Sequence, residues 1–182
     1  NSNVSWAYYN SGKTKTAAKD EEGAKVDFGQ SKTYSQKAVT LDPKLDAAYL
    51  NLGSTHNALG EYQLAVNVLN TAVSLNNNWV IAMNQLGYGY RGLNDLTNAV
   101  AIFKRAVDLD GKNTYGLFNL GEAYHASGNK NEAKKINDRL RKINPKLAAS
   151  LDNIFSGKAV LDNATRKIDQ KIPKVKVPRI PF

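Results

Sequence analysis

The chain of 182 residues contains no cysteine, one methionine and five prolines. The lack of cysteine excludes disulfide bonds, thiolate metal ligands and a cysteine nucleophile. It suits an oxidising compartment without requiring one. The compartment therefore stays open, although we favour an extracytoplasmic location, secreted or periplasmic, over a cytoplasmic one.

Long apolar runs and the short motifs of enzymes are missing as well. No stretch approaches 18 consecutive apolar residues, so we expect no transmembrane segment. No HExxH pair, serine-centred elbow or phosphate loop occurs. Residues 87–92 match GxGxxG, but a dinucleotide site needs a strand before this motif, and a helix is expected here instead. We therefore expect no enzyme activity, no catalytic residues, no cofactor and no metal site.

Negative charge is scarce in the last third of the chain. The protein has a net charge of +9. Residues 130–182 contain 14 Lys and Arg against 5 Asp and Glu, whereas residues 1–129 contain 11 of each kind. Such an asymmetry is typical of an interaction surface, a tail or a solvated face. One candidate function is therefore peripheral binding of an acidic surface, such as a glycan, lipid headgroups or nucleic acid, of which nucleic acid is the least favoured.

What the sequence does contain is an internal repeat. Leu-Gly pairs begin at residues 52, 86 and 120, and alanines occupy positions 65, 99 and 133, so both features recur every 34 residues. A period shared by many positions predicts tandem copies of one supersecondary unit. The other positions that keep this spacing are Tyr49, Met83 and Leu117, then His56, Tyr90 and Tyr124, then Leu69 and Phe103, and Ala72 and Ala106.

This pattern resembles the tetratricopeptide repeat (TPR) family, in which W-x2-L-G-x2-Y is followed by A-x3-F and a proline. The resemblance implies an all-α fold, a right-handed α-solenoid of antiparallel helix pairs, because neither helix of a pair can bury its apolar face alone. It implies four repeats, at about residues 5–45, 46–79, 80–113 and 114–147. Capping helices over residues 148–170 and an extended, basic, proline-rich tail over residues 171–182 are expected to follow.

Small residues and turn residues occur where such helix pairs need them. A small residue lets two paired helices approach closely at their crossing. Glycine and asparagine tolerate the left-handed conformation that ends a helix. The predicted crossing positions are Gly53, Gly87 and Gly121, and the predicted turn positions are Gly60, Asn94 and Gly128.

The first unit is irregular. Ala24 and Phe28 match the start of a second helix, but the closing Asp42-Pro43 comes seven residues late. Seven residues are two helical turns, which keep the apolar stripe on one face. A longer second helix is therefore predicted rather than a loop. Asp42-Pro43 and Asn144-Pro145 each predict an N-cap followed by proline at the first helical position.

The resemblance also implies a binding groove on the concave side of the solenoid, lined by one face of each first helix. The set is too aromatic for a merely solvated surface, and exposed aromatic patches mark binding sites. Recognition of an acidic C-terminus is not expected, because cations are missing around Asn84. The groove residues carried over from the family are Trp6, Tyr9, Leu50, Ser54, Asn57, Ile81, Asn84, Tyr88, Arg91, Tyr115, Phe118, Glu122 and His125.

The tail interleaves apolar residues with cations and contains three prolines. Proline at this density excludes helix and favours an extended or polyproline conformation. We expect the tail to dock in a groove, most readily that of a neighbouring copy, because twelve extended residues reach only about 40 Å. The residues expected to make this contact are Ile172, Val175, Val177, Ile180 and Phe182.

Two sequons place glycan acceptors at Asn3 and Asn163 if the protein is secreted from a eukaryotic cell. Such triplets also arise by chance in a chain that is rich in asparagine.

Three functions are candidates for the whole chain. The first is a non-enzymatic scaffold for protein–protein interaction that binds a polypeptide segment in the concave groove. The second is a structural subunit that self-assembles into an oligomer or filament by docking its tail on a neighbouring copy. The third is the binding of an acidic surface described above. We favour the first, with a protein or peptide as the partner.

Overall fold

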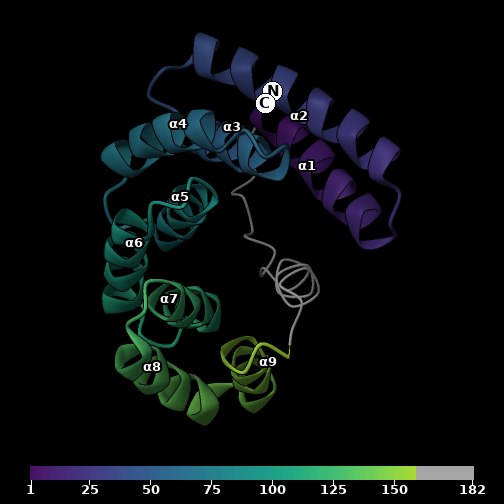
Figure 1. The fold of residues 1–182 in the computed structure, drawn as a ribbon. Helices are drawn as coiled ribbons and strands as arrows, with labels where there is room; N and C mark the ends of the chain where they lie inside the picture. The colour runs from purple at the N-terminus through teal and green to yellow at the C-terminus, as the bar shows by residue number, and fades with distance from the viewer. Residues whose placement is uncertain (159–182) are drawn as a thin grey trace.

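The computed structural model describes residues 1–158. Within these residues the chain forms nine α-helices and no β-strand, as Figure 1 shows, which confirms the predicted all-α fold class. In chain order the helices are α1 (Ser2–Ala17), α2 (Glu21–Leu41), α3 (Asp46–Ala58), α4 (Tyr62–Leu75), α5 (Val80–Gly92), α6 (Leu96–Leu109), α7 (Thr114–Ala126), α8 (Lys130–Ile143) and α9 (Pro145–Phe155).

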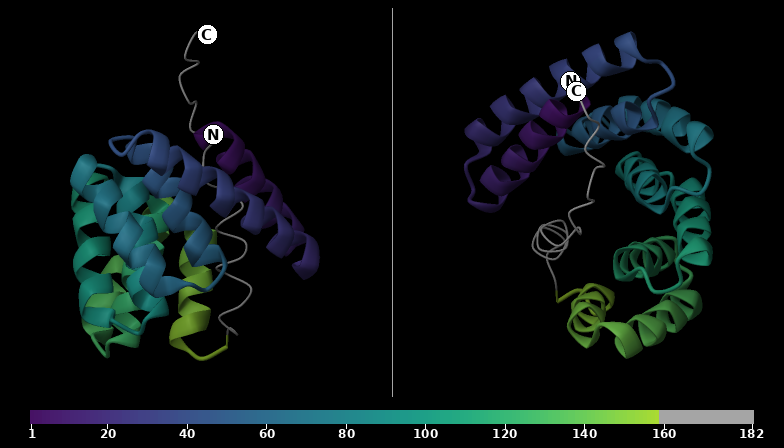
Figure 2. Two further views of the ribbon diagram at one scale, coloured as in Figure 1. Left: turned by 90° about the horizontal axis from the view of Figure 1, so that it is seen from above. Right: turned by 180° about the vertical axis from the view of Figure 1, so that it is seen from behind.

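The helices are arranged in an arc, with each helix packed against the next one along the chain. The odd-numbered helices lie on the inner side of the arc and the even-numbered helices on the outer side, a layout that is also clear from behind in Figure 2. Each inner helix also contacts the next inner helix. Contacts are thus made between elements that are near in sequence, which is the packing of an α-solenoid.

A glycine in the inner helix makes room for a large side chain of its outer partner. A Cβ atom at Gly87 would lie 2.6 Å from the ring of Phe103, which is fully buried. Gly53 has the same relationship to Leu69. These contacts bring α5 against α6 and α3 against α4, and they place Leu69 and Phe103 in the two main apolar clusters.

The array continues beyond the fourth helix pair through α9. At Gly121 of α7, the outer helix supplies Asn137 where the preceding pair has Phe103, and Leu151 of α9 packs against the glycine instead. Leu151 is fully buried, and Asn137 Nδ2 donates a hydrogen bond to Asp152 Oδ1 at 2.6 Å. Helix α9 therefore covers the end of the fourth pair. Of the capping region predicted at residues 148–170, residues 159–170 lie outside the described part of the chain.

Each helix pair is joined by a turn with one left-handed residue. The φ angles are 74° at Gly60, 59° at Asn94 and 81° at Gly128, which confirms the predicted turn positions. Lys19 occupies the equivalent position between α1 and α2, with φ of 63°. In each turn, the next residue donates its backbone N–H to a carbonyl in the last turn of the inner helix, as from Glu61 to His56 at 2.9 Å. This is the Schellman arrangement, which satisfies carbonyls at a helix end.

The turns between successive pairs have a different geometry, and one prediction about them is wrong. Asp42 and Pro43 do not begin α3, which starts at Asp46. They form a turn in which Leu45 donates to the Asp42 carbonyl at 3.1 Å and the Asp42 side chain accepts from the Lys44 N–H at 3.0 Å. Aspartate and proline favour such a turn as much as a helix start, so the dipeptide alone could not distinguish them.

Asn144-Pro145 does begin a helix. Pro145 is in the first turn of α9, and Asn144 Oδ1 accepts the Leu147 N–H at 3.1 Å. Asn144 also ends α8, so no separate turn intervenes.

The first pair contains the long second helix that the sequence predicts. Helix α2 has 21 residues, whereas α4, α6 and α8 have 14 each. It begins with Asp20 as N-cap, whose Oδ1 accepts the Gly23 N–H at 2.9 Å. Buried hydroxyls join it to its neighbours, since Ser31 Oγ lies 3.2 Å from Ser5 Oγ of α1 and 2.7 Å from Thr55 Oγ1 of α3.

Candidate peptide-binding groove

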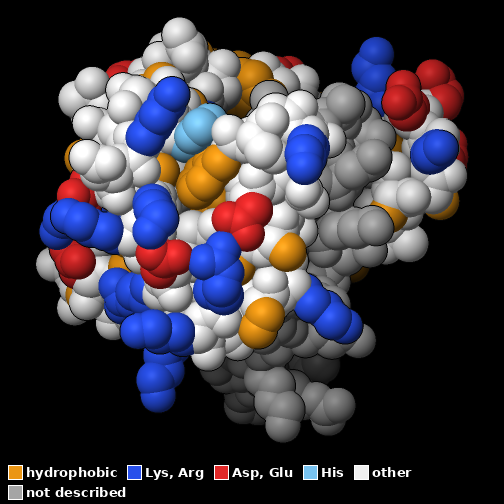
Figure 3. All heavy atoms as spheres, turned by 60° about the horizontal axis from the view of Figure 1, so that its bottom comes forward, with side chains coloured by type: hydrophobic (Ala, Val, Ile, Leu, Met, Phe, Trp, Pro, Cys, Tyr) orange, Lys and Arg blue, Asp and Glu red, His pale blue; other side chains and the backbone are white. Residues whose placement is uncertain are grey.

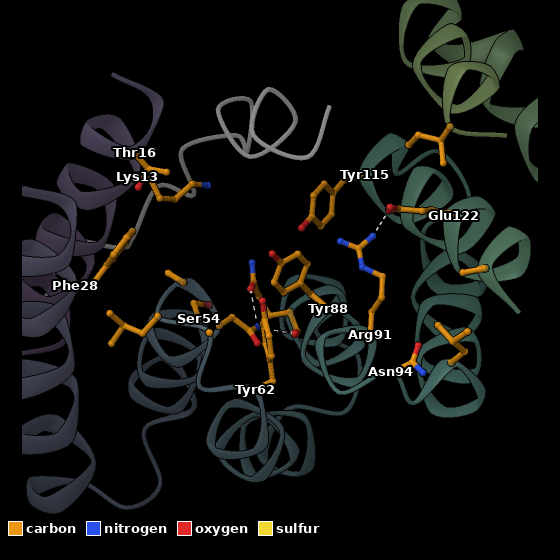
Figure 4. A pocket seen from close by; sticks show the side chains of 18 of the residues that line it. Lys13, Thr16, Phe28, Ser54, Tyr62, Tyr88, Arg91, Asn94, Tyr115 and Glu122 are labelled. Carbon is orange, nitrogen blue, oxygen red and sulfur yellow. Dashed lines mark hydrogen bonds and ion pairs between the residues drawn. The ribbon is translucent and has the colours of Figure 1, made fainter. Parts of the chain in front are cut away.

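A cavity of about 940 Å³ lies on the inner side of the arc. Its lining comes from α1 and α2 at one end, α3 to α7 in the middle and α9 at the other end. Figure 4 shows Lys13 and Phe28 facing Tyr88, Arg91 and Tyr115 across this space. We call this cavity the groove. One continuous space thus touches every pair of the solenoid.

The 34-residue period explains how the middle of the groove is built. Two positions of each inner helix point into it, three residues apart and therefore on one helix face. Because the helix pairs repeat along the arc, equivalent residues form rows along the groove. The first row is Ser54, Tyr88 and Glu122, and the second is Asn57, Arg91 and His125.

Aromatic and charged side chains are packed together at the centre of the groove. The rings of Tyr62 and Tyr88 meet edge to face, with centroids 6.2 Å apart. The Arg91 guanidinium lies 5.0 Å from the centroid of the Tyr88 ring, a cation–π distance. Arg91 also forms an ion pair with Glu122, shown as a dashed line in Figure 4. Their side chains are 17% and 5% exposed, so this charge pair is largely removed from water.

A second aromatic cluster lies at the α1–α2 end of the groove. Tyr9 stacks on Trp6 with ring centroids 5.3 Å apart. Its ring is tilted against that of Phe28, with centroids 5.9 Å apart. Lys13 Nζ lies 5.7 Å from the centroid of the Tyr9 ring. At the opposite end, His125 stacks on Phe155 of α9 with centroids 4.6 Å apart. Ring surfaces are therefore present along the whole length of the groove.

Amide groups connect neighbouring inner helices beneath these rings. Asn57 Nδ2 of α3 donates to the Gln85 backbone carbonyl of α5 at 2.8 Å and to Gln85 Oε1 at 3.2 Å. Asn57 is 5% exposed and its Oδ1 makes no hydrogen bond. The Asn57 amide thus fixes the spacing of two inner helices, and its buried Oδ1 faces Gly89 of α5, 3.2 Å from where a Cβ of that glycine would lie.

Of the groove residues predicted from the sequence, the structure brings eight together around the cavity and leaves five outside it. Trp6 packs behind Tyr9, and Ile81 packs against the apolar cluster of the second and third pairs. The residues that line the cavity are Tyr9, Ser54, Asn57, Tyr88, Arg91, Tyr115, Glu122 and His125.

Leu50, Asn84 and Phe118 form a row that does not reach the groove. Leu50 and Phe118 are buried in the apolar clusters, and Phe118 has no exposed surface. Asn84 is 3% exposed, and its Oδ1 is within 3.4 Å of where a Cβ of Gly116 in α7 would lie. This row therefore points between successive inner helices. The assignment of Leu50, Asn84 and Phe118 as ligand contacts is corrected accordingly.

The structure adds Tyr62, Phe28 and Lys13, which the sequence analysis did not place in the groove. Tyr62 belongs to an outer helix, and its ring reaches the groove because it lies directly against Gly92 of α5. The three glycines of the GxGxxG segment are the sequence feature that could have indicated this contact. Gly87 accommodates Phe103, Gly89 accommodates Val66 and Gly92 accommodates Tyr62, so the motif serves helix packing.

Asn3, the first predicted glycan acceptor, is exposed in the first turn of α1. Asn163 and the tail residues Ile172, Val175, Val177, Ile180 and Phe182 lie outside the described residues.

Between residues 1 and 158 no three His, Asp or Glu side chains gather as they would around a metal ion. In this range no helix combines the length and the apolarity needed to cross a membrane.

Cations are abundant on the surface over the lower part of the arc, where Figure 3 shows many Lys and Arg side chains with Asp and Glu between them. Several of these cations are engaged. Arg139 donates to the Gly111 carbonyl at 2.7 Å, and Arg141 pairs with Asp138 at 2.8 Å and with Asp152 at 2.7 Å. The surface is thus a mixed-charge face more than an open row of cations.

Comparisons with known proteins agree with this geometry. Two models of the tetratricopeptide repeat family match the chain, one over residues 90–151 and one over residues 46–78, and together they cover more than half of it. No curated protein matches the chain.

Solved structures with a similar fold include one titled "Crystal structure of MamA", with a TM-score of 0.66 and 23% identity over 83% of this chain and 90% of that one. A second, "MamA RS-1 ArsTM double mutant", has a TM-score of 0.63 and 23% identity over 65% of this chain and 67% of that one. A third, "Crystal structure of MamA protein", has a TM-score of 0.60 and 21% identity over 80% and 94%. At this level of identity the likeness concerns the fold.

Proposed function

Because the chain belongs to the tetratricopeptide repeat family, whose members are protein-interaction scaffolds, we propose that it captures a polypeptide segment in its groove. We propose the same four repeats as before, at about residues 5–45, 46–79, 80–113 and 114–147. The partner segment would run along the arc and contact successive inner helices.

The observation that carries this proposal is the continuity of the groove. A cavity of about 940 Å³ is at the upper end of the size range of ligand sites, and its walls come from all four helix pairs. An elongated ligand can therefore contact several rows at once, whereas a compact ligand would leave most of the space empty. Ring faces such as those of Tyr62 and Tyr88 offer apolar contact area to such a ligand.

The groove chemistry favours a mainly apolar segment with few charges in direct contact. The most central charges, Arg91 and Glu122, already neutralise each other. Breaking a desolvated ion pair to bind a ligand charge would cost more than it gains. The affinity is therefore expected to come from ring contacts, with Arg91 held over Tyr88 as part of the wall.

Binding of an acidic surface has weaker support from the described residues. The cations of α8 are largely matched by Glu132, Asp138 and Asp152, and Arg139 is bonded to a backbone carbonyl. Such side chains would have to leave their partners to bind phosphate or sulfate. The groove therefore remains the surface that we propose as functional.

The test is a selection of peptides from a random twelve-residue display library on the full chain, followed by fluorescence anisotropy with the selected peptides. Tyr88→Ala should weaken binding about tenfold or more, since buried aromatic residues dominate interface energies. Tyr34→Ala is the matched control, because Tyr34 stacks on Tyr8 of α1 and does not line the groove. Circular dichroism should show that both variants keep their helices. Equal losses for both variants, or a library that yields no binder, would overturn the proposal.

A further inference from the structure

The described chain ends at the groove. Ile154 of α9 and Gly157, two residues beyond the end of α9, both line the cavity. The sequence continues from Lys158 for another 24 residues, to Phe182. Any ligand supplied by these residues would start from the rim of the groove, on the side opposite α1 and α2.

The last twelve residues have the composition of a groove ligand. Their sequence, KIPKVKVPRIPF, places an apolar or proline residue next to nearly every cation and contains a PxxP unit at residues 178–181. Proline fixes φ and has no N–H to satisfy, so such a segment can dock without pairing its whole backbone. Proline-rich segments are recognised by aromatic-lined grooves, where rings pack against the pyrrolidine and neighbouring apolar side chains.

The groove has the complementary surface. Ring faces come from Phe28 near α1, from Tyr62 and Tyr88 at the centre, and from His125 stacked on Phe155 near α9. They are distributed along the cavity and not gathered in one pocket. An extended segment with apolar residues at several positions can contact these rings in turn while its cations remain in water.

We propose that residues 171–182 occupy the groove of their own chain, as an internal ligand that an external partner must displace. This inference rests on the proposed function, since it takes the groove to be a peptide-binding site. It adds that the tail occupies this site before an external partner binds. An external partner would then compete with this segment for the same contacts.

Geometry and entropy both favour the same chain over a neighbour. The sequence alone pointed to a neighbouring copy because a twelve-residue tail cannot extend along the whole array. The position of α9 removes that objection, since the twelve residues 159–170 precede the tail at the rim. They span about 18 Å as the predicted capping helix and about 40 Å if extended. A short tether gives an effective concentration in the millimolar range. A tail with only millimolar intrinsic affinity would thus be bound about half of the time.

The test uses the absence of cysteine in the full chain. Lys176→Cys in the tail is combined with Ala126→Cys, an exposed groove residue at the end of α7. In a matched pair it is combined with Ala101→Cys, an exposed alanine of the outer helix α6 that does not line the groove. Under mild oxidation the groove pair should form a disulfide within one chain in at least fivefold higher yield than the control pair.

Two results of this cross-linking would overturn the inference. Equal yields for the two pairs would mean that the tail does not prefer the groove. A disulfide that joins two chains would mean that the tail binds a neighbouring copy, as in the self-assembling alternative.

A second measurement separates this inference from the proposed function. The double substitution Ile180→Asp and Phe182→Asp should weaken the internal ligand. Because a tail bound half of the time leaves half of the grooves free, the full chain carrying both substitutions should bind a library-selected peptide about twofold more tightly than the unaltered chain. Equal affinities would overturn the internal ligand and leave the proposed function intact. If neither form binds any selected peptide while the disulfide still forms within one chain, the proposed function fails and the internal contact stands.

Discussion

Arg91 of α5 and Glu122 of α7 form an ion pair that joins two successive inner helices across the wall of the groove. The residues occupy different rows, so the pair is diagonal and connects the second position of one repeat to the first position of the next. Arg91 also lies over the ring of Tyr88. One side chain thus holds the relative position of two repeats and supports an aromatic contact surface.

Removing Arg91 should destabilise the solenoid. Arg91→Met keeps the apolar part of the side chain but leaves the 5%-exposed Glu122 side chain without its cation, at an expected cost of about 1–3 kcal/mol. Thermal unfolding followed by circular dichroism measures this loss. The double variant Arg91→Met with Glu122→Leu should regain part of the stability, because no unpaired charge is left. If the two substitutions are additive, the residues do not interact as described.

Two glycines in helices should respond to alanine in opposite directions. Gly87→Ala places a methyl group 2.6 Å from the Phe103 ring and should cost about 1–3 kcal/mol through overpacking. Gly29→Ala lies within α2 with no atom inside 4 Å of its new Cβ, so it should stabilise the protein by about 0.4–1 kcal/mol. Melting temperatures of the two variants give the comparison. An unchanged melting temperature for Gly87→Ala would contradict the crossing described for α5 and α6.

The four turns within helix pairs allow an exchange experiment. Lys19 has a left-handed φ of 63°, which costs energy for a residue with a Cβ, so Lys19→Gly should raise stability by about 0.5–1 kcal/mol. Gly60 has φ of 74° at the equivalent position, and Gly60→Lys should lower stability by a similar amount. Urea unfolding measures both changes in the free energy of unfolding, provided that its dependence on urea concentration has the same slope in each variant. Changes of the same sign in the two variants would refute the equivalence of the turns.

The stability contributed by Asp27 should depend on pH. Hydrogen bonds from Lys15 and from Ser11 hold the pKa of the Asp27 carboxyl below its ordinary value of 3.8, although burial opposes them. The ionised form is therefore favoured in the folded state, and its contribution is complete above pH 3.8 and is lost as the pH falls through the lower folded value.

Melting temperatures measured between about pH 6 and pH 2 would show this dependence. The difference between the unaltered protein and Asp27→Asn should be largest near neutral pH and should shrink in acid. Asp108→Asn is the control, because Asp108 forms an exposed pair with Lys104 and should matter little at any pH. A difference for Asp27→Asn that stays constant over this range would show that its ionisation is not linked to folding.

The fold could be predicted largely from spacing. Glycine at residues 53, 87 and 121 marks helix crossings, and Gly60, Asn94 and Gly128 mark left-handed turns, because each of these positions admits few other residue types. The Asp42-Pro43 turn could not be predicted in the same way. The dipeptide is compatible with a turn and with a helix start, and the choice depends on where the next helix packs.

The groove was predictable only in part. The repeat period identifies equivalent residues, so the row of Asn57, Arg91 and His125 could be found from the sequence. It does not say which rows face the cavity, because that depends on the curvature of the array, and Phe118 proved to be core. Tyr62 could not be assigned from the pattern of the inner helices, since it comes from an outer helix and depends on the space above Gly92.

The turns between helix pairs bear on how the number of repeats can change during evolution. The same backbone hydrogen bond closes the turn from Asp42 to Leu45, from Asn76 to Trp79 and from Asp110 to Asn113. A duplication or deletion that begins in one of these turns and ends in the next changes the chain by one 34-residue module and rejoins matching ends. Such an event would lengthen or shorten the groove by one residue in each row and leave the crossings inside every other module as they are. New binding specificity is thus open to the protein through copying of modules, a route that is closed to a fold built around one central core.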